Sequence, residues 1–156
     1  MIKNQNKQVD FKIALIAAEW HEDLVSVAVD SCSAELSKLG VVEKNIKLFK
    51  VPGSLEIPLI SKLIIQNGDF DAVIGFGLVV DGGIYRHEFV AQTVLNGLMK
   101  VTLETKVPVL SVVLTPQKFD EKNPDDIEFF RQHLVIKGNE AAQTAVKMIN
   151  IVKELT

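Results

Sequence analysis

Four short apolar runs, separated by segments of helical periodicity, constrain the fold of this chain most strongly. The runs occupy residues 12–18, 46–51, 72–80 and 107–114. Nearly continuous apolar runs of this length are typical of strands that are covered on both faces, and residues 46–51 alternate apolar and polar side chains as a strand does. We therefore predict four β-strands. Gly75 and Gly77 in the third strand predict a close approach of other backbone or of a ligand.

Helical periodicity fills the intervals between these runs. The predicted helices span residues 22–39, 55–67, 88–105 and 139–155, with a polar stretch at 116–126 before the last of them. Strands that alternate with helices through short connections imply parallel strands and right-handed crossovers. The sequence thus predicts an α/β fold, a doubly wound parallel sheet with helices on both faces.

The length of 156 residues fits one domain. We expect a polar N-terminal arm at residues 1–11 and a single folded domain at 12–156. No apolar run approaches the roughly 18 residues of a membrane span, and the polar start lacks the apolar core of a signal peptide. These features predict a cytoplasmic protein without membrane contact.

Composition and motifs exclude several functional classes. The net charge is -3 with interspersed signs, which argues against nucleic acid as a partner. Cys32 is the only cysteine and is predicted to be a buried, inert thiol. The sequence contains no metal-ligand spacing and no nucleophile elbow, so no metal site is expected. The 47% apolar share in so short a chain favours self-association.

Chemically versatile side chains gather after the predicted strands, where an open parallel sheet binds ligands. The only tryptophan, Trp20, follows the first strand, and the only tyrosine lies in the segment 81–87 after the third. The three histidines also lie at or beyond strand ends, at positions 21, 87 and 133. Such a site would combine stacking, proton transfer and anion binding.

Each of these residues also has a purely structural interpretation. Trp20 fits a plug at one end of the core as well as a stacking surface. Glu56 would stabilise the first turn of a helix capped by Ser54. Gly82–Gly83 fits a tight turn, and Arg86–His87 fits a solvated surface pair.

Three ordered segments, VPGSLEIP at 51–58, GLVVDGGIYRHEFV at 77–90 and LETKVPVLSVVLT at 103–115, resemble the 6,7-dimethyl-8-ribityllumazine synthase family. The similarity runs from about residue 12 to near the C-terminus. It implies a flavodoxin-like three-layer α/β/α fold with a central four-stranded parallel sheet. It also implies condensation of 5-amino-6-(D-ribitylamino)uracil with 3,4-dihydroxy-2-butanone 4-phosphate, the penultimate step of riboflavin biosynthesis, without a cofactor.

The resemblance also implies roles for individual residues. The pyrimidine and its ribityl chain would contact Trp20, Ser54, Leu55, Glu56, Val79, Val80 and Asp81. The phosphate would contact Gly82, Gly83 and Ile84, together with Arg131 or His133. Proton transfer would fall to Arg86 or His87, and Ser111 would take the position of an aromatic residue that a neighbouring subunit supplies.

Trp20-His21 and the segment IYRHEF resemble the second, Trp-containing branch of the family (type II), whose members are typically decamers of two pentamers. Gly138 stands alone where the shell-forming branch has a glycine-rich kink, which favours a pentamer pair over a capsid. Trp20 would also permit riboflavin binding. Two alternatives stay open: a flavin- or lumazine-binding paralogue with little turnover, and a flavodoxin-like regulatory module, although the first strand lacks the acidic cluster of a receiver domain.

Overall fold

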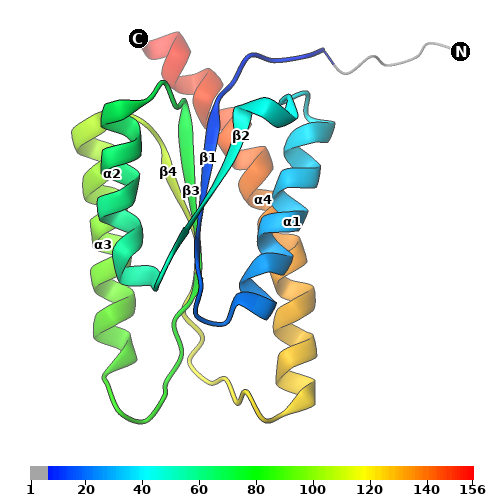
Figure 1. The fold of residues 1–156 in the computed structure, drawn as a ribbon, viewed down its shortest axis with the longest axis vertical. Helices are drawn as coiled ribbons and strands as arrows, with labels where there is room; N and C mark the ends of the chain where they lie inside the picture. The colour runs from blue at the N-terminus through cyan, green and yellow to red at the C-terminus, as the bar shows by residue number, and fades with distance from the viewer. Residues whose placement is uncertain (1–6) are drawn as a thin grey trace, which may run out of the picture.

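The computed structural model describes residues 7–156, which fold into three layers with the sheet in the middle (Figure 1). The strands are β1 (Ile13–Ala18), β2 (Ile46–Val51), β3 (Ala72–Leu78) and β4 (Val109–Leu114). The helices are α1 (Glu22–Lys38), α2 (Ile57–Asn67), α3 (His87–Thr105) and α4 (Pro124–Leu155). Short 3-10 turns, η1 (Glu43–Asn45) and η2 (Ser54–Glu56), precede β2 and α2.

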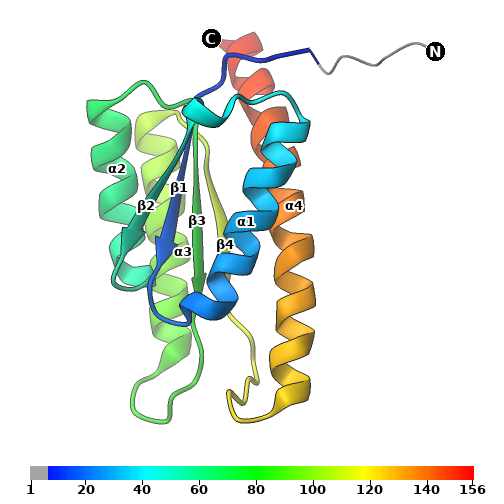
Figure 2. The ribbon, with the colours of Figure 1, turned by 45° about the vertical axis from the view of Figure 1, so that its right-hand side comes forward.

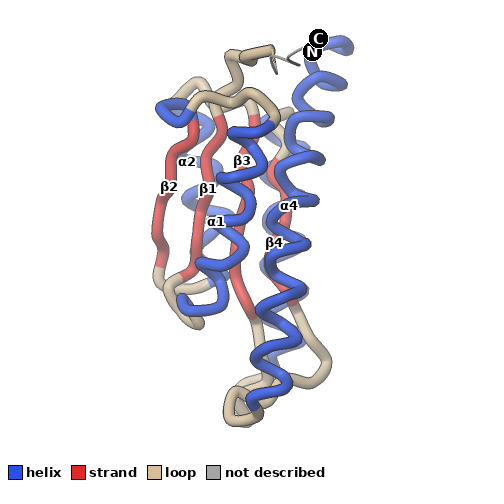
Figure 3. The backbone as a smooth tube through the Cα atoms, turned by 90° about the vertical axis from the view of Figure 1, so that its right-hand side faces the viewer, coloured by secondary structure: helices blue, strands red, loops and turns tan. Residues whose placement is uncertain are grey.

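The four strands form one parallel sheet in the order β2-β1-β3-β4. In register, Ile13 of β1 lies beside Ile46 on one side and Ala72 on the other. This is the strand order of flavodoxin-like sheets, so the predicted fold class is confirmed. All four carboxyl ends point the same way, toward the lower loops of Figure 3.

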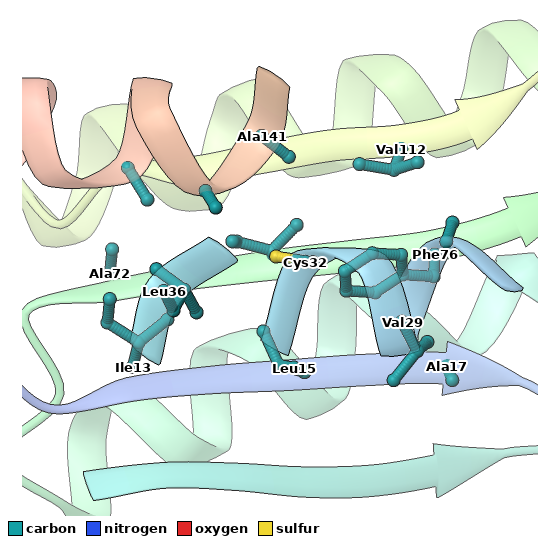
Figure 4. Close-up of a cluster of buried hydrophobic side chains, with 14 of the residues drawn as sticks. Ile13, Leu15, Ala17, Val29, Cys32, Leu36, Ala72, Phe76, Val112 and Ala141 are labelled. Carbon is teal, nitrogen blue, oxygen red and sulfur yellow. The ribbon is translucent and has the colours of Figure 1, made fainter. Parts of the chain in front are cut away.

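Alternation along the central strands divides the apolar side chains between two helical layers. Ile13 and Leu15 pack toward α1 and α4, whereas Ala14 and Ile16 pack toward α2 and α3. Figure 2 shows these helix pairs on opposite faces of the sheet, and Figure 4 shows Phe76 and other side chains of the α1 side. Burying each such large side chain contributes roughly 1.5–3 kcal/mol, which fixes the strand register.

Cys32 lies in the middle of this core. Its side chain is fully buried, and it is a free thiol. Burial raises the pKa of the Cys32 thiol to about 12 because the thiolate would lose its hydration. The prediction of a buried thiol is confirmed.

The start of the last helix was predicted wrongly. α4 begins at Pro124 rather than near Asn139, so it is 32 residues long. The side chain of Asn123 caps it by accepting a hydrogen bond from the Asp125 N–H at 3.0 Å, and proline suits the first turn of a helix. Gly138 lies inside this helix. The position needs a glycine because a Cβ there would collide with the Ala28 carbonyl of α1.

The N-terminal arm is described from residue 7 onward, and residues 1–6 of the predicted arm lie outside the described part. Within it, Val9 pairs with Val41 in a parallel bridge, and its N–H donates to the Gly40 carbonyl at 3.0 Å. Over residues 7–156, no helix is both long and apolar enough to cross a membrane.

Candidate functional site

Two adjoining hollows open at the carboxyl edge of the sheet. The first has a volume of about 210 Å³ and is lined by Trp20, Gly53, Ser54, Leu55, Glu56, Leu78, Val79, Tyr85 and Val90. The second has a volume of about 410 Å³ and is lined by His21, Val80, Asp81, Gly82, Tyr85, Phe119, Asp120, Glu121 and Lys122. The first is therefore the more apolar, and the second is bordered by charged side chains.

Trp20 lies in the loop after β1 and forms one wall of the first hollow. Its backbone N–H donates to the Pro52 carbonyl at 3.3 Å, and the preceding N–H of Glu19 donates to the Val51 carbonyl at 2.8 Å. These bonds tie the loops after β1 and β2 together. The Trp20 residue is 67% exposed, so the interpretation of Trp20 as a core plug is wrong. A held but exposed indole presents a face on which a planar ring can stack.

Glu56 and Ser54 come from the short turn η2. A carboxylate oxygen of Glu56, Oε2, accepts a hydrogen bond from the Gly53 N–H at 3.0 Å. The predicted helix cap at Ser54 is wrong, because η2 begins at Ser54 and its cap is Gly53. Ser54 is buried, and this carboxylate contact fixes the Glu56 side chain at the rim of the hollow.

Ser54 reaches its place because β3 carries a glycine opposite it. A Cβ at Gly77 would collide with the Ser54 hydroxyl, and a Cβ at Gly75 would lie 2.9 Å from Ile57. A close approach does occur at these glycines, but it is not of the predicted kind. The groups that approach are side chains of η2 and α2 rather than backbone or a ligand.

The loop between β3 and α3 is held by two internal hydrogen bonds. The Gly83 N–H donates to Oδ1 of Asp81 at 2.9 Å, and the Tyr85 hydroxyl donates to the Val80 carbonyl at 2.9 Å. Gly83 has φ 76°, a conformation that glycine adopts with least strain. Ile84 is 95% exposed, so its side chain provides no anchor.

Arg86 and His87 start α3 but line neither hollow. The Arg86 guanidinium lies over the Phe89 ring at 4.5 Å, and its Nε lies 3.0 Å from a Glu88 oxygen. The side chain of Arg86 is 71% exposed and that of His87 is 18% exposed, with His87 Nδ1 3.3 Å from Glu88. The backbone amide of Glu88 and the Arg86 guanidinium hold the pKa of the Glu88 carboxyl below its ordinary value.

The predicted residues Arg131, His133 and Ser111 line neither hollow of this chain. Arg131 is on α4 with its Nε 3.8 Å from a Glu128 oxygen, and His133 stacks on Phe129 with the ring planes 5° apart. Ser111 is an exposed residue of the edge strand β4. The structure therefore does not bring these three together with Trp20 in one chain.

The other predicted contact residues divide between the two hollows. Trp20, Ser54, Leu55, Glu56 and Val79 share the first, while Val80, Asp81 and Gly82 share the second. Gly83 and Ile84 follow in the same loop without lining either hollow. Sequence reasoning assigned no role to Tyr85, although it is the only tyrosine and lies at a strand end.

Two further groups border the second hollow: His21, which was expected near a strand end without a specific role, and Lys122, which was not predicted. His21, in a left-handed conformation at φ 58°, sets its ring edge-on to Phe119 at 6.1 Å, and Lys122 borders the same hollow. Between residues 7 and 156, no cluster of three or more His, Cys, Asp or Glu side chains is arranged to hold a metal ion.

Comparison with known proteins places the chain in a family. The family model described as 6,7-dimethyl-8-ribityllumazine synthase matches residues 10–153. A protein named 6,7-dimethyl-8-ribityllumazine synthase 2 from Pseudomonas syringae pv. tomato is 47% identical over 144 residues, which cover 92% of this chain and 84% of that protein. The 6,7-dimethyl-8-ribityllumazine synthase of Rhodococcus erythropolis is 44% identical over 144 residues and 92% of each chain.

A protein named 6,7-dimethyl-8-ribityllumazine synthase 2 from Bradyrhizobium diazoefficiens is 44% identical over 138 residues, which cover 88% of this chain and 82% of that protein. The match to the family model and the extent of these similarities agree with the ordered motifs and with the flavodoxin-like sheet. This chain belongs to the 6,7-dimethyl-8-ribityllumazine synthase family.

Proposed function

We propose that the two hollows at the carboxyl edge catalyse the lumazine synthase reaction. In it, 5-amino-6-(D-ribitylamino)uracil condenses with 3,4-dihydroxy-2-butanone 4-phosphate to give 6,7-dimethyl-8-ribityllumazine and phosphate, a step of riboflavin biosynthesis. The observation that carries the proposal is the first hollow, in which an exposed, backbone-anchored indole and the Glu56 carboxylate line one cavity. The domain responsible spans residues 12–156 and acts in the cytoplasm.

The first hollow receives the pyrimidine. Trp20 stacks on its ring, and the polar edge of the heterocycle contacts the backbone of Val79 in this hollow and of Val80 and Asp81 at the border of the second. Glu56 accepts hydrogen bonds from ribityl hydroxyls, with Ser54 and Leu55 beside it. Because Oε2 of Glu56 is held by the Gly53 N–H, the orientation of this acceptor is fixed before the substrate binds.

The sugar phosphate binds at the loop after β3, where backbone N–H groups of Gly82, Gly83 and Ile84 contact its phosphate. In the free chain the Gly83 N–H bonds to Asp81, so phosphate exchanges with that carboxylate. The second hollow is also lined by Asp120, Glu121 and Lys122, so charges of both signs surround the place proposed for the phosphate.

The reaction needs amine attack on a ketone, loss of water, phosphate elimination and ring closure. These steps are proton transfers together with stabilisation of a departing anion, and the protein needs no cofactor for them. His87 rather than Arg86 is the proton-transferring group, because a neutral imidazole has one donor and one acceptor nitrogen, whereas a guanidinium has donors only. Holding two reactive substrates together supplies much of the remaining acceleration.

A neighbouring copy completes the site. Arg131 or His133 supplies the cationic contact to phosphate, and Ser111 forms part of the wall. Exposed apolar side chains recur at helical spacing on α2 and α3, where a second copy would bury them: Leu59, Leu63, Leu95, Met99 and Leu103. We propose pentamers paired as a decamer, and mass measurement of the assembly tests this.

The decisive experiment mixes both substrates with the purified protein and follows lumazine fluorescence and released phosphate against the spontaneous reaction. Product formation well above the spontaneous rate, with one phosphate per lumazine, supports the enzyme. Saturable riboflavin binding at Trp20 without such turnover favours the second candidate, a flavin- or lumazine-binding paralogue, which the exposed indole also fits. A Glu56→Ala variant, which has no acceptor oxygen, argues against the ribityl contact if it retains full activity.

A further inference from the structure

Tyr85 occupies a special place between the two hollows. Among the described residues, it alone lines both of them. Its hydroxyl donates to the Val80 carbonyl at 2.9 Å, and its ring lies beside Gly82, where a Cβ would stand 3.7 Å from ring carbon Cε1. The Tyr85 side chain thus lines the first hollow and also forms a hydrogen bond to the loop that borders the second.

We propose that Tyr85 is a positioning residue for this reaction. Its ring is the shared wall of the two compartments, and its hydroxyl sets the direction of the Val80–Asp81 peptide. The inference rests on the proposed function, since it assigns the first hollow to the pyrimidine and the adjoining loop to the sugar phosphate. Tyr85 does not exchange protons with substrate, because its hydroxyl hydrogen is engaged by Val80.

The hydrogen bond acts where the loop has few other restraints. Before it, the Val79 N–H is anchored to the Leu114 carbonyl at 2.9 Å, and after it α3 begins at His87. Between these points lie Gly82 and Gly83, whose backbones are free to adopt many conformations. Two hydrogen bonds restrain this segment: one joins Asp81 to the Gly83 N–H, and the other joins the Tyr85 hydroxyl to the Val80 carbonyl.

Peptide planarity converts this restraint into substrate positioning. A peptide bond is planar and trans, so fixing the Val80 carbonyl also fixes the Asp81 N–H on the opposite side. The N–H groups that follow, of Gly82, Gly83 and Ile84, are those proposed to contact the phosphate. Removing the hydroxyl therefore releases the anion-binding backbone while the Trp20–Glu56 part of the first hollow keeps its own bonds.

Two variants separate the ring from the hydroxyl. Tyr85→Phe keeps the wall and removes the hydrogen bond, whereas Tyr85→Leu removes both. Thr156→Val is the matched control, because it deletes a hydroxyl that donates to the Val152 carbonyl at 2.8 Å at the far end of α4. Each variant is compared with the unsubstituted protein for binding of inorganic phosphate and of riboflavin at equilibrium, for thermal stability, and for the KM of each substrate.

Tyr85→Phe should weaken phosphate binding and raise the KM of the sugar phosphate roughly threefold to tenfold, the range expected for one hydrogen bond. Its riboflavin affinity and pyrimidine KM should change by no more than about twofold, because the Trp20 and Glu56 contacts remain and only the backbone contact at Val80–Asp81 is loosened, while Tyr85→Leu should weaken both ligands. If Tyr85 had only a structural role, Tyr85→Phe would lower thermal stability without weakening phosphate binding more than riboflavin binding. Equal changes for both ligands in Tyr85→Phe, or no change, overturn the inference.

Equilibrium binding keeps this test independent of turnover. If the wild-type protein makes no lumazine, the proposed function fails, and the phosphate and riboflavin measurements still decide the role of Tyr85. A wild-type protein that binds no inorganic phosphate refutes the positioning role. Normal turnover with a Tyr85→Phe variant indistinguishable from Thr156→Val refutes it while the proposed function stands.

Discussion

Replacing Trp20 by alanine should separate ligand affinity from stability. Stacking of a heterocyclic base on an aromatic side chain contributes about 1–3 kcal/mol, so riboflavin and the pyrimidine substrate should bind roughly fivefold to 150-fold more weakly. Trp20 is 67% exposed in the free protein, so its replacement removes little buried side-chain surface from the core. The free energy of unfolding should therefore change by less than about 1 kcal/mol.

The affinity is best measured from the fluorescence of the flavin itself, because the variant lacks the indole whose quenching would otherwise report binding. Trp20→Phe retains a smaller ring and should give an intermediate affinity. Leu155→Ala is a suitable control, since Leu155 is an apolar residue that is 82% exposed and lies at the C-terminal end of α4. Urea unfolding of all variants gives the stability in parallel.

Two results would refute this reasoning. An alanine variant with unchanged flavin affinity would show that the indole does not stack on the ligand. A loss of several kcal/mol in unfolding free energy would show that the indole contributes to the core, contrary to its exposure. Loss of affinity with the stability retained is the result that the geometry requires.

Three further predictions follow from contacts at the carboxyl edge and in the core. Gly77→Ala forces Ser54 out of its place and should cost about 1–3 kcal/mol in urea unfolding, whereas an unchanged midpoint would contradict the contact. Gly83→Ala should cost about 1 kcal/mol because φ is 76°, and Gly82→Ala, which has ordinary space, should cost less; the two unfolding curves test the order. Cys32, with its pKa raised to about 12, stays protonated below that pH and should react with a thiol reagent only as fast as the protein unfolds, so rapid labelling of the native protein would disprove its burial.

The strands were predictable because their signal is local. The continuous apolar runs of β1 and β3 are buried on both faces, and the alternating residues 46–51 coincide with edge strand β2. The start of α4 was not predictable in the same way. Gly138 resembles a helix boundary in sequence, and only its contact with the α1 backbone shows why a glycine is needed within the helix.

Part of the site was likewise predictable from local sequence, and the rest depends on tertiary contacts. The rule that ligands bind beyond strand carboxyl ends placed Trp20 and Glu56 together, and the family resemblance added Val79; the first hollow contains all three. The contacts of Asp81 and Tyr85 depend on how one loop folds back on itself, which residue spacing does not encode. In the proposed assembly Arg131 reaches the site from a second copy, and a single sequence does not show where that copy lies.

The two halves of the site differ in how the backbone is held, and this difference explains the pattern of expected effects. The loops after β1 and β2 are joined by bonds from Glu19 and Trp20 to the Val51 and Pro52 carbonyls, which continue the sheet ladder beyond the strands. The loop after β3 loses that ladder after Val79 and relies on its own side chains. Substitutions in the loops after β1 and β2 should therefore change the free energy of unfolding or the affinity for the heterocyclic ring. Substitutions in the loop after β3 should change the affinity for phosphate, because side-chain hydrogen bonds within this loop replace the backbone bonds of the sheet.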